Sequence, residues 1–213
     1  MKKQYAFNGE KTMERNPLRQ QALANPLSQW ALNERLESAL LLFPKKAKKV
    51  LDFGCGEGHF IGRLQTSMPH AEFFGIDASN ENVLFCRRKW KGTFETCSHI
   101  PEKFSQNPVD VITLLEILDH LEDPAKVLKQ AHDALTPDGM IIVSVPDTAS
   151  LKWNVIWGVW TNTFGRIWKH AHIQHFNERT LTRLLEEKKF TILEKKRALF
   201  NCIMIFKCVK HIP

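Results

Sequence analysis

A glycine-rich turn between an apolar strand and a helix constrains the fold of this chain more than any other feature. Residues 50–58 read Val-Leu-Asp-Phe-Gly-Cys-Gly-Glu-Gly, and Gly75-Ile76-Asp77 ends the next apolar run. Glycines let a backbone approach a ligand closely where a strand passes into a helix. An acid about 20 residues farther along suits the hydroxyls of a ribose. The pattern therefore predicts a binding site for a cofactor that contains adenosine.

The spacing of the glycines narrows the class of cofactor. Gly54, Gly56 and Gly58 follow the order Gly-x-Gly-x-Gly, whereas a dinucleotide-binding turn needs Gly-x-Gly-x-x-Gly and a P-loop needs a following Gly-Lys-Ser/Thr. Asp52 stands at the mouth of the turn, where its charge would repel a pyrophosphate and attract an ammonium group. S-adenosylmethionine combines an adenosine with an amino-acid end, so these residues favour it.

Together these features resemble the class I S-adenosylmethionine-dependent methyltransferases, whose signature is VLDxGCGxG followed by an acid at the end of the second strand. Later segments are similar to the same family, namely Leu135-Thr136-Pro137-Asp138-Gly139-Met140, the stretch 116–124 and the stretch from His172 to Phe190. Asn16-Pro17-Leu18-Arg19 resembles a segment of the ubiquinone-biosynthesis O-methyltransferases, within methyltransferase types 11 and 23. The resemblance implies transfer of a methyl group from S-adenosylmethionine.

Apolar runs alternate with helical patterns along the chain. This alternation predicts an α/β fold with a doubly wound, mostly parallel seven-stranded sheet, helices on both faces and an antiparallel last strand. Strands are expected at 48–53, 72–77, 93–96, 109–115, 140–145, 190–199 and 202–209. Helices are expected at 18–43, 58–68, 80–90, from 124 to a turn at 137–139, and at 178–188. We expect residues 1–43 to form an N-terminal helical cap and residues 44–213 the methyltransferase domain.

The resemblance also implies which residues hold the cofactor. At the amino-acid end, Arg19 is expected to pair with the carboxylate, with Arg35 as a second candidate, and Asp52 is expected to accept a hydrogen bond from the ammonium. The remaining residues expected at the cofactor, from the turn to the adenine and the sulfonium, are Gly54, Cys55, Gly56, Asp77, Ala78, Cys97 and Leu115. By the same resemblance, Asp77 is expected to hold the ribose hydroxyls, Ala78 to contact the adenine and Leu115 to lie under the sulfonium.

A cluster of acids and histidines follows the fourth expected strand. Glu116, Asp119 and His120 would share one face if they were helical, and carboxylates favour a hard cation such as Mg²⁺. The family resemblance to quinone-type and small-RNA 3′-end methyltransferases implies a fourth metal ligand, here His175 or His172. The alternatives are local hydrogen bonding by His120 with solvated acids, or a metal-free role for His120 or His172 as general base toward a hydroxyl.

A tryptophan-rich stretch at about 148–171 is expected to form a lid insertion. Its aromatic residues, which recur at helical spacing, are Trp153, Trp157, Trp160, Phe164 and Trp168. The stretch could cover a large apolar substrate, lie in a membrane interface through residues 150–171, or pack as an ordinary helix on the sheet.

Composition bounds the remaining choices. The chain has 213 residues and a formal net charge of +7. Its five cysteines lack CxxC spacing, which predicts reduced thiols in a cytoplasmic protein. The tryptophan-rich stretch could add a peripheral contact with a membrane. We expect a methyltransferase that acts on a hydroxyl of a small apolar or aromatic acceptor. An RNA-end methyltransferase and a non-catalytic cofactor-binding partner protein are the alternatives, although no RNA-binding module or focused basic stripe is recognisable.

Overall fold

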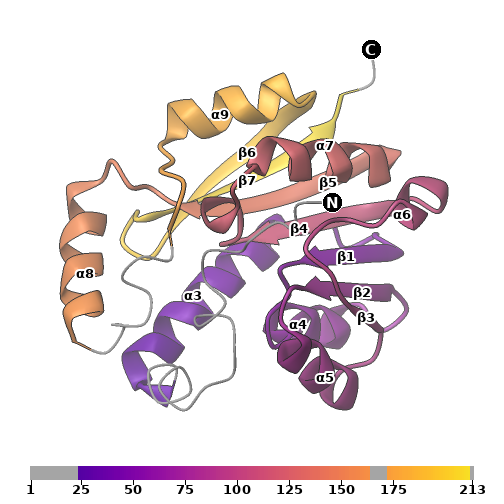
Figure 1. Ribbon diagram of the computed structural model, residues 1–213, viewed down its shortest axis with the longest axis horizontal. Coiled ribbons are helices and arrows are strands. Elements are labelled where there is room, and N and C mark those ends of the chain that lie inside the picture. The colour runs from indigo at the N-terminus through magenta and orange to yellow at the C-terminus, as the bar shows by residue number, and fades with distance from the viewer. Residues whose placement is uncertain (1–23, 164–171, 212–213) are drawn as a thin grey trace, which may run out of the picture.

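The protein folds around one seven-stranded sheet. The structure is a computed structural model that describes residues 24–163 and 172–211. Within these residues the strands follow the order β3-β2-β1-β4-β5-β7-β6, as Figure 1 shows. The pairs among β1 to β5 are parallel, whereas β7 is antiparallel to both β5 and β6. This arrangement confirms the predicted fold, including the antiparallel last strand.

The bounds of the elements agree closely with those predicted from the sequence. The strands are β1 (Lys49–Phe53), β2 (Glu72–Asp77), β3 (Thr93–Thr96), β4 (Val109–Leu115), β5 (Leu135–Pro146), β6 (Phe190–Ala198) and β7 (Ile203–Lys210). The helices are α3 (Pro26–Leu42), α4 (His59–Ser67), α5 (Asn80–Lys89), α6 (Lys103–Gln106), α7 (Pro124–Ala134), α8 (Leu151–Asn162) and α9 (Glu178–Glu187), with a 3₁₀ helix, η1 (Leu118–His120).

Two elements differ from the prediction: α6 is not among the expected helices, and the predicted turn at 137–139 lies inside the fifth strand. β5 begins at Leu135, directly after α7, rather than at Met140. Val109 of β4 is opposite Leu135 and Val111 is opposite Met140, so Thr136–Gly139 fall in a register shift. The Pro-Asp-Gly signal therefore marks an irregularity within a strand, because pairing with β4 continues on both sides of it.

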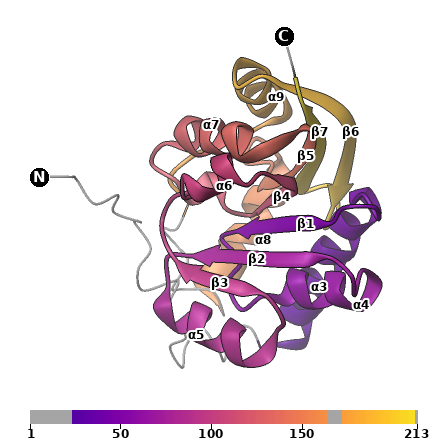
Figure 2. The ribbon, with the colours of Figure 1, turned by 90° about the vertical axis from the view of Figure 1, so that its right-hand side faces the viewer.

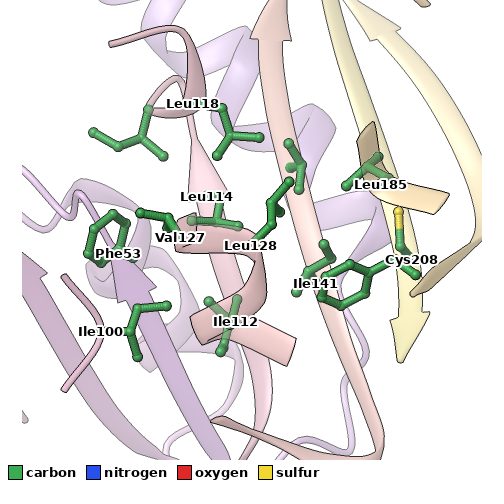
Figure 3. Packing of buried hydrophobic residues seen from close by; sticks show 14 of the residues in the cluster. Phe53, Ile100, Ile112, Leu114, Leu118, Val127, Leu128, Ile141, Leu185 and Cys208 are labelled. Atoms are coloured by element: carbon green, nitrogen blue, oxygen red, sulfur yellow. The ribbon is translucent and has the colours of Figure 1, made fainter. Parts of the chain in front are cut away.

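Helices cover both faces of the sheet and bury a separate apolar cluster on each face. Helices α6, α7 and α9 lie on one face and α3, α4 and α5 on the other (Figures 1 and 2). Neighbouring strand residues alternate between the faces, so that Leu51 belongs to the first cluster and Val50 to the second. Figure 3 shows part of the first cluster, where Val127 and Leu128 of α7 lie over Leu114 of β4.

Side-chain caps define where several helices begin. Asn25 accepts a hydrogen bond from the backbone N–H of Leu27, and Pro26 occupies the first turn of α3, where its missing N–H costs nothing. Asn177 and Thr180 form a reciprocal capping box at α9. Of the helix expected at 18–43, the described part runs from Pro26 to Leu42, and residues 18–23 lie outside the described ranges.

Helix α8 forms the described part of the expected tryptophan-rich lid. Ser150 caps its N-terminus by accepting from the backbone N–H of Trp153. In Figure 1 the helix stands at the side of the molecule, apart from the helices that cover the sheet. Residues 164–171, which include Phe164 and Trp168, lie outside the described part of the chain. No helix within the described residues is long and apolar enough to cross a membrane.

Candidate functional site

The glycine turn between β1 and α4 takes a conformation that its sequence requires. Gly54 has a φ of +78°, and a Cβ at this position would lie 2.8 Å from the side chain of Ile117. Gly56 also has a positive φ, +53°, but a Cβ there would meet no atom within 4 Å. Gly54 is therefore glycine for packing as well as backbone reasons. Gly56 faces open space, as expected of a backbone that a ligand approaches.

The carboxylate of Asp77 holds the glycine turn in place. Its Oδ2 accepts from the backbone N–H of Gly56 at 2.8 Å, while its Oδ1 accepts from the N–H of Ser79 at 2.8 Å and from the side-chain amide of Asn82 at 3.1 Å. The carboxylate is buried at the end of β2. Asp77 therefore joins the glycine turn to the start of α5, which is a structural task that the sequence pattern alone did not reveal.

Asp52 is a buried carboxylate at the end of β1. Its Oδ1 accepts a hydrogen bond from the hydroxyl of Thr113 on β4 at 2.5 Å. Burial raises the pKa of Asp52, the hydrogen bond from Thr113 lowers it and the nearby charge of Asp77 raises it, and the net result is a pKa of about 7. A carboxylate poised near neutrality in the wall of a cavity is a marker of a functional site.

A cavity of about 430 Å³ opens between the glycine turn and helix α3. Asp52, the turn residues 54–57 and Leu115 line it on one side, and Arg35 on the other. Its position at the carboxyl ends of β1 and β4 is where ligands bind in doubly wound sheets. Of the residues expected at the amino-acid end of the cofactor, the cavity brings together Arg35, Asp52 and the glycine turn, whereas Arg19 lies outside the described residues. The lining does not include Asp77, Ala78 or Cys97.

Glu116 enters this cavity in a strained and tightly held conformation. It directly follows β4 with a φ of +53°, which is uncommon for a residue other than glycine. Its backbone N–H donates to the carbonyl and the hydroxyl of Ser144, each at 3.0 Å, and its Oε1 accepts from the Ser144 hydroxyl at 2.7 Å. Its Oε2 lies 3.3 Å from Nη1 of Arg35. Glu116 therefore lies before the helical turn η1, which corrects the prediction that residues 116, 119 and 120 share one helical face.

Asp119, His120 and His172 form a compact cluster beyond β4, which we call the Asp–His cluster. Oδ2 of Asp119 lies 3.5 Å from Nε2 of His120 and 3.3 Å from Nε2 of His172. One ligand atom from each residue lies within 4.8 Å of the others. The backbone carbonyl of Asp119 accepts from the N–H groups of Ile173 and Gln174, so two backbone hydrogen bonds fix the segment that carries His172 against η1.

Burial changes the acid–base properties of the Asp–His cluster. Asp119 is 1% exposed, and neither of its carboxylate oxygens has a hydrogen-bond partner among the described residues. Burial raises the pKa of Asp119 to about 6, with opposing effects from the neighbouring charges. Burial, together with the charges of His120 and His175, lowers the pKa of His172 to about 3, so the ring of His172 is neutral at pH 7.

Two tryptophans of α8 face the Asp–His cluster. The ring of Trp157 stacks on the ring of His172 with centroids 4.4 Å apart, and Trp153 stacks on both, 5.2 Å from Trp157 and 5.8 Å from His172. His120 lies 5.0 Å from His172, also centroid to centroid. The helix therefore contributes an aromatic wall beside a buried carboxylate and two imidazoles.

The structure brings together only some of the residues expected to bind a metal ion. Asp119 and His120 are joined by His172, whereas Glu116 is bound to Arg35 and Ser144, and His175 is exposed and outside the cluster. The donors that remain are one carboxylate and two imidazoles. Mg²⁺ prefers oxygen ligands in octahedral geometry, so this donor set does not fit the expected Mg²⁺ site.

The remaining residues expected to bind the cofactor lie outside the cavity lining or outside the described residues. Arg19 lies outside the described ranges. Cys97 follows β3, donates its N–H to the carbonyl of Asp77, and has its Sγ 3.2 Å from Nδ1 of His99. Ala78 is half-buried directly after β2. Sequence reasoning missed Thr113 and Ser144, although a polar residue near the end of an apolar strand is a signal that could have identified both.

Comparisons with known proteins identify the family of this chain. Residues 28–195 match a family model described as a methyltransferase domain. The ubiquinone biosynthesis O-methyltransferase of Aliivibrio fischeri (strain ATCC 700601 / ES114) is 32% identical over 126 residues, which are 56% of this chain and 50% of that protein. The enzyme of the same name from Yersinia enterocolitica is 30% identical over 112 residues, 50% of this chain and 46% of that protein. The chain thus spans about half the length of these curated relatives.

Solved structures show the same fold at low sequence identity. A chain in the complex between the Haloferax volcanii Trm112 methyltransferase activator and a putative methyltransferase has a TM-score of 0.72 at 14% identity, and the match covers 90% of this chain and 95% of that one. The N-methyltransferase NodS from Bradyrhizobium japonicum WM9, solved with S-adenosyl-L-homocysteine, has a TM-score of 0.63 at 18% identity, and covers 94% and 95%. The family model spans most of the chain, and the fold and glycine turn agree with it. The chain therefore belongs to the S-adenosylmethionine-dependent methyltransferases.

Proposed function

We propose that this protein transfers the methyl group of S-adenosylmethionine to a hydroxyl of a small apolar or aromatic acceptor. The observation that carries the proposal is the Asp–His cluster, which lies just past the end of β4, where Leu115 and Glu116 line the cavity. A hydroxyl must lose its proton as it is methylated, and imidazoles beside a carboxylate are suited to accept one. The aromatic wall of Trp153 and Trp157 supports an acceptor that is apolar or aromatic.

In this proposal the cofactor binds in the cavity, against the glycine turn that Asp77 holds. S-adenosylmethionine supplies an electrophilic methyl group on a positively charged sulfur. Asp52 would accept a hydrogen bond from the ammonium, and Leu115 would lie beneath the sulfur. The other proposed cofactor contacts are those of Arg19, Gly54, Cys55, Gly56, Asp77, Ala78 and Cys97. Because both oxygens of Asp77 already hold backbone or amide groups, its contact with the ribose would add to these bonds.

The acceptor end of the reaction uses the two histidines. We assign proton uptake to His120, whose side chain is 22% exposed and whose Nε2 lies beside the buried carboxylate of Asp119. His172, neutral because burial lowers its pKa to about 3, would position the hydroxyl by hydrogen bonding. The acceptor oxygen forms a bond to the methyl carbon as the carbon–sulfur bond breaks, and the hydroxyl proton passes to the imidazole. No step is assigned to Mg²⁺, because the donor set does not fit it.

An apolar acceptor is also consistent with a contact between α8 and a membrane surface. Leu151, Val155 and Val159 are 79%, 58% and 62% exposed on the side of α8 that does not stack on His172. From Thr148 to Asn177 the sequence contains no Asp or Glu. Apolar and tryptophan residues without acidic neighbours favour the interface of an anionic bilayer. We therefore propose an anionic lipid surface as a partner.

Label transfer tests the proposed acceptor class. Radiolabelled methyl from S-adenosylmethionine is transferred into a cell extract, which is then separated into an organic phase, small polar metabolites, RNA and protein. The proposal expects label in the organic phase. Label confined to RNA, to protein or to polar metabolites would contradict it, and so would the absence of any transfer by a protein that binds the cofactor.

Variants of the Asp–His cluster test the proposed roles. We expect His120→Gln to lower kcat by at least ~100-fold, the lower end of what general acid–base catalysis contributes. His172→Gln should also lower kcat, through loss of positioning, and both variants should keep the affinity for S-adenosylhomocysteine within about two-fold. His70→Gln, on an exposed loop before β2, is the matched control and should retain full activity. Equal loss of turnover and cofactor affinity in the two cluster variants would indicate a structural role instead.

A further inference from the structure

The ion pair between Arg35 and Glu116 occupies the cavity in which the amino-acid end of the cofactor is expected. Arg35 extends from α3, and its Nη1 lies 3.3 Å from Oε2 of Glu116. Both side chains line the cavity together with Asp52 and the glycine turn. Among the described lining residues, Arg35 is the only one with a permanent positive charge. It is therefore the strongest attachment point for an anion in this cavity.

The two partners of the ion pair differ in how firmly they are held. Glu116 is fixed by its bonds to Ser144 through both its backbone N–H and its Oε1. Arg35 donates from Nε to the carbonyl of Ala31 one helical turn earlier at 3.1 Å, and its Nη1 is directed to Glu116, which also lines the cavity. A guanidinium has five donors in a fork that matches a carboxylate. Arg35 can thus exchange one carboxylate for another without leaving its place on α3.

We propose that the carboxylate of Glu116 holds the place of the cofactor carboxylate on Arg35, so that S-adenosylmethionine binds by displacing Glu116 from this contact. The proposal gives Arg35 the role of a specificity residue for a ligand with a free carboxylate, and gives Glu116 the role of an internal competitor. It depends on the chain binding S-adenosylmethionine and is independent of the acceptor, because no methyl transfer is involved.

This exchange predicts opposite effects for the two partners. Removal of the positive charge on Arg35 should weaken cofactor binding, because a carboxylate would lose a charge-assisted contact. Removal of the charge on Glu116 should strengthen binding, because the cofactor would no longer compete for Arg35. A simple structural ion pair predicts the same direction for both changes, namely weaker binding.

Two ligands that differ by one carboxylate test the proposal directly. The affinities of S-adenosylmethionine and of its decarboxylated form, which retains the ammonium and the sulfonium, are measured by titration calorimetry without acceptor. For Arg35→Gln we expect S-adenosylmethionine to bind at least ~10-fold more weakly, as for the loss of a hydrogen bond to a charged group, and the decarboxylated form to change by less than about two-fold. Arg35→Lys, which keeps the charge but not the fork, should be intermediate.

Glu116→Gln is the decisive variant. Its amide oxygen can still accept from Ser144, so the local structure is preserved, and we expect S-adenosylmethionine to bind about 3-fold or more tightly, in keeping with the modest strength of a partly exposed ion pair. The decarboxylated ligand should not change. Arg63→Gln is the matched control, because Arg63 on α4 forms an ion pair with Glu37 on α3 outside the lining of the cavity.

Other results would overturn the proposal. Weaker binding of S-adenosylmethionine by Glu116→Gln would mean that Glu116 contacts the cofactor favourably. Equal weakening of both ligands by Arg35→Gln, or the same effect from Arg63→Gln, would mean that Arg35 only positions α3. Loss of the preference for a carboxylate in Arg19→Gln, but not in Arg35→Gln, would place the anchor on Arg19. Circular dichroism and thermal melting establish that each variant is folded.

Discussion

Among single residues, Asp52 has the clearest conflict between stability and ligand binding. Its carboxylate is buried at the end of β1, and one hydroxyl, that of Thr113, donates to it. Its pKa is raised, chiefly by burial, from 3.8 to about 7, so ionising Asp52 in the folded, ligand-free protein costs free energy that the unfolded chain does not incur. An ammonium in the cavity would favour the charged form and relieve this cost. The residue is thus suited to a positively charged ligand more than to the stability of the fold.

Asp52→Asn should separate these two effects. Because the folded pKa of Asp52 lies above its unfolded value, the wild type loses stability as the pH rises from about 4 through 7. We expect the stability advantage of the variant to be larger at pH 8 than at pH 5, by on the order of 2 kcal/mol at ~1.4 kcal/mol per pKa unit. Urea denaturation of both ligand-free proteins at both pH values measures this difference.

The same variant should bind S-adenosylmethionine more weakly, because the neutral amide lacks the charge that attracts the ammonium. In the wild type, affinity should fall as the pH drops below 7, and this dependence should be reduced in the variant. Comparing the two proteins at each pH cancels the contributions of all other titrating groups. An equal stability advantage at pH 5 and pH 8 would contradict the raised pKa of Asp52.

Among the elements, α8 has two apolar sides with different environments. Trp153 and Trp157 stack toward His172, whereas Leu151, Val155 and Val159 face outward and are mostly exposed. A surface helix ordinarily presents a polar face to water. The outward apolar stripe therefore has no explanation in the folding of the described residues, which is why we relate it to an anionic lipid surface.

Replacement of Leu151, Val155 and Val159 by serine should abolish that contact. Each buried aliphatic side chain contributes about 1.5–3 kcal/mol when fully removed from water, so partial burial of three should account for at least a ~10-fold change in partitioning. Cosedimentation with vesicles of phosphatidylcholine and phosphatidylglycerol measures the change.

Serine replacements of Leu41, Leu84 and Leu193 provide the matched control. These residues are 72%, 42% and 53% exposed and belong to α3, α5 and β6. The control should bind vesicles as the wild type does. Equal binding by both triple variants, or self-association of the wild type through α8 in analytical ultracentrifugation, would exclude the proposed lipid contact.

The sequence predicts most elements of this fold because local and periodic signals agree. Apolar runs mark the buried parallel strands, and Pro124 after Asp123 marks the first turn of α7. The Pro137-Asp138-Gly139 signal fails as a strand boundary because β4 pairs with residues on both sides of it. Turn-forming residues are a local signal, so they cannot show that the pairing of β4 with β5 continues on both sides of a distortion.

The candidate site is predictable only in part, for a related reason. Asp52, Gly54 and Leu115 could be placed at the cavity because the glycine motif and the end of the fourth predicted strand meet at one edge of the sheet. The pairing of His172 with Asp119, and of Arg35 with Glu116, joins residues that are 53 and 81 positions apart. No periodicity connects such residues, so sequence reasoning placed Glu116 in the Asp–His cluster rather than on Arg35.

For the whole molecule, β7 is the strand that joins β6 to the parallel part of the sheet. It lies between β5 and β6, and Phe206 near its middle is opposite Val143 of β5 and Lys195 of β6. Phe206 is 1% exposed in the cluster beneath α7 and α9. The strand therefore contributes both backbone pairing, with β5 and β6, and core packing, through Phe206.

Phe206→Ala should accordingly destabilise the protein by about 3–5 kcal/mol, the usual cost of a large aromatic-to-alanine cavity. Leu193→Ala, on the neighbouring strand but 53% exposed, should change the free energy of unfolding by less than ~0.5 kcal/mol, as is usual at surface positions. Equilibrium urea denaturation followed by circular dichroism measures both. Similar effects from the two variants would contradict the buried position of Phe206 in the core.

The position of β7 also has a consequence for how the chain acquires its structure during translation. The edge of β5 that pairs with β7 is built from Met140–Pro146, which leave the ribosome long before Ile203–Lys210 have been made. Until then that edge offers unpaired backbone groups and β-branched side chains to any other extended segment, including a second nascent copy. Protection by chaperones should thus matter most in the interval between synthesis of these two strands.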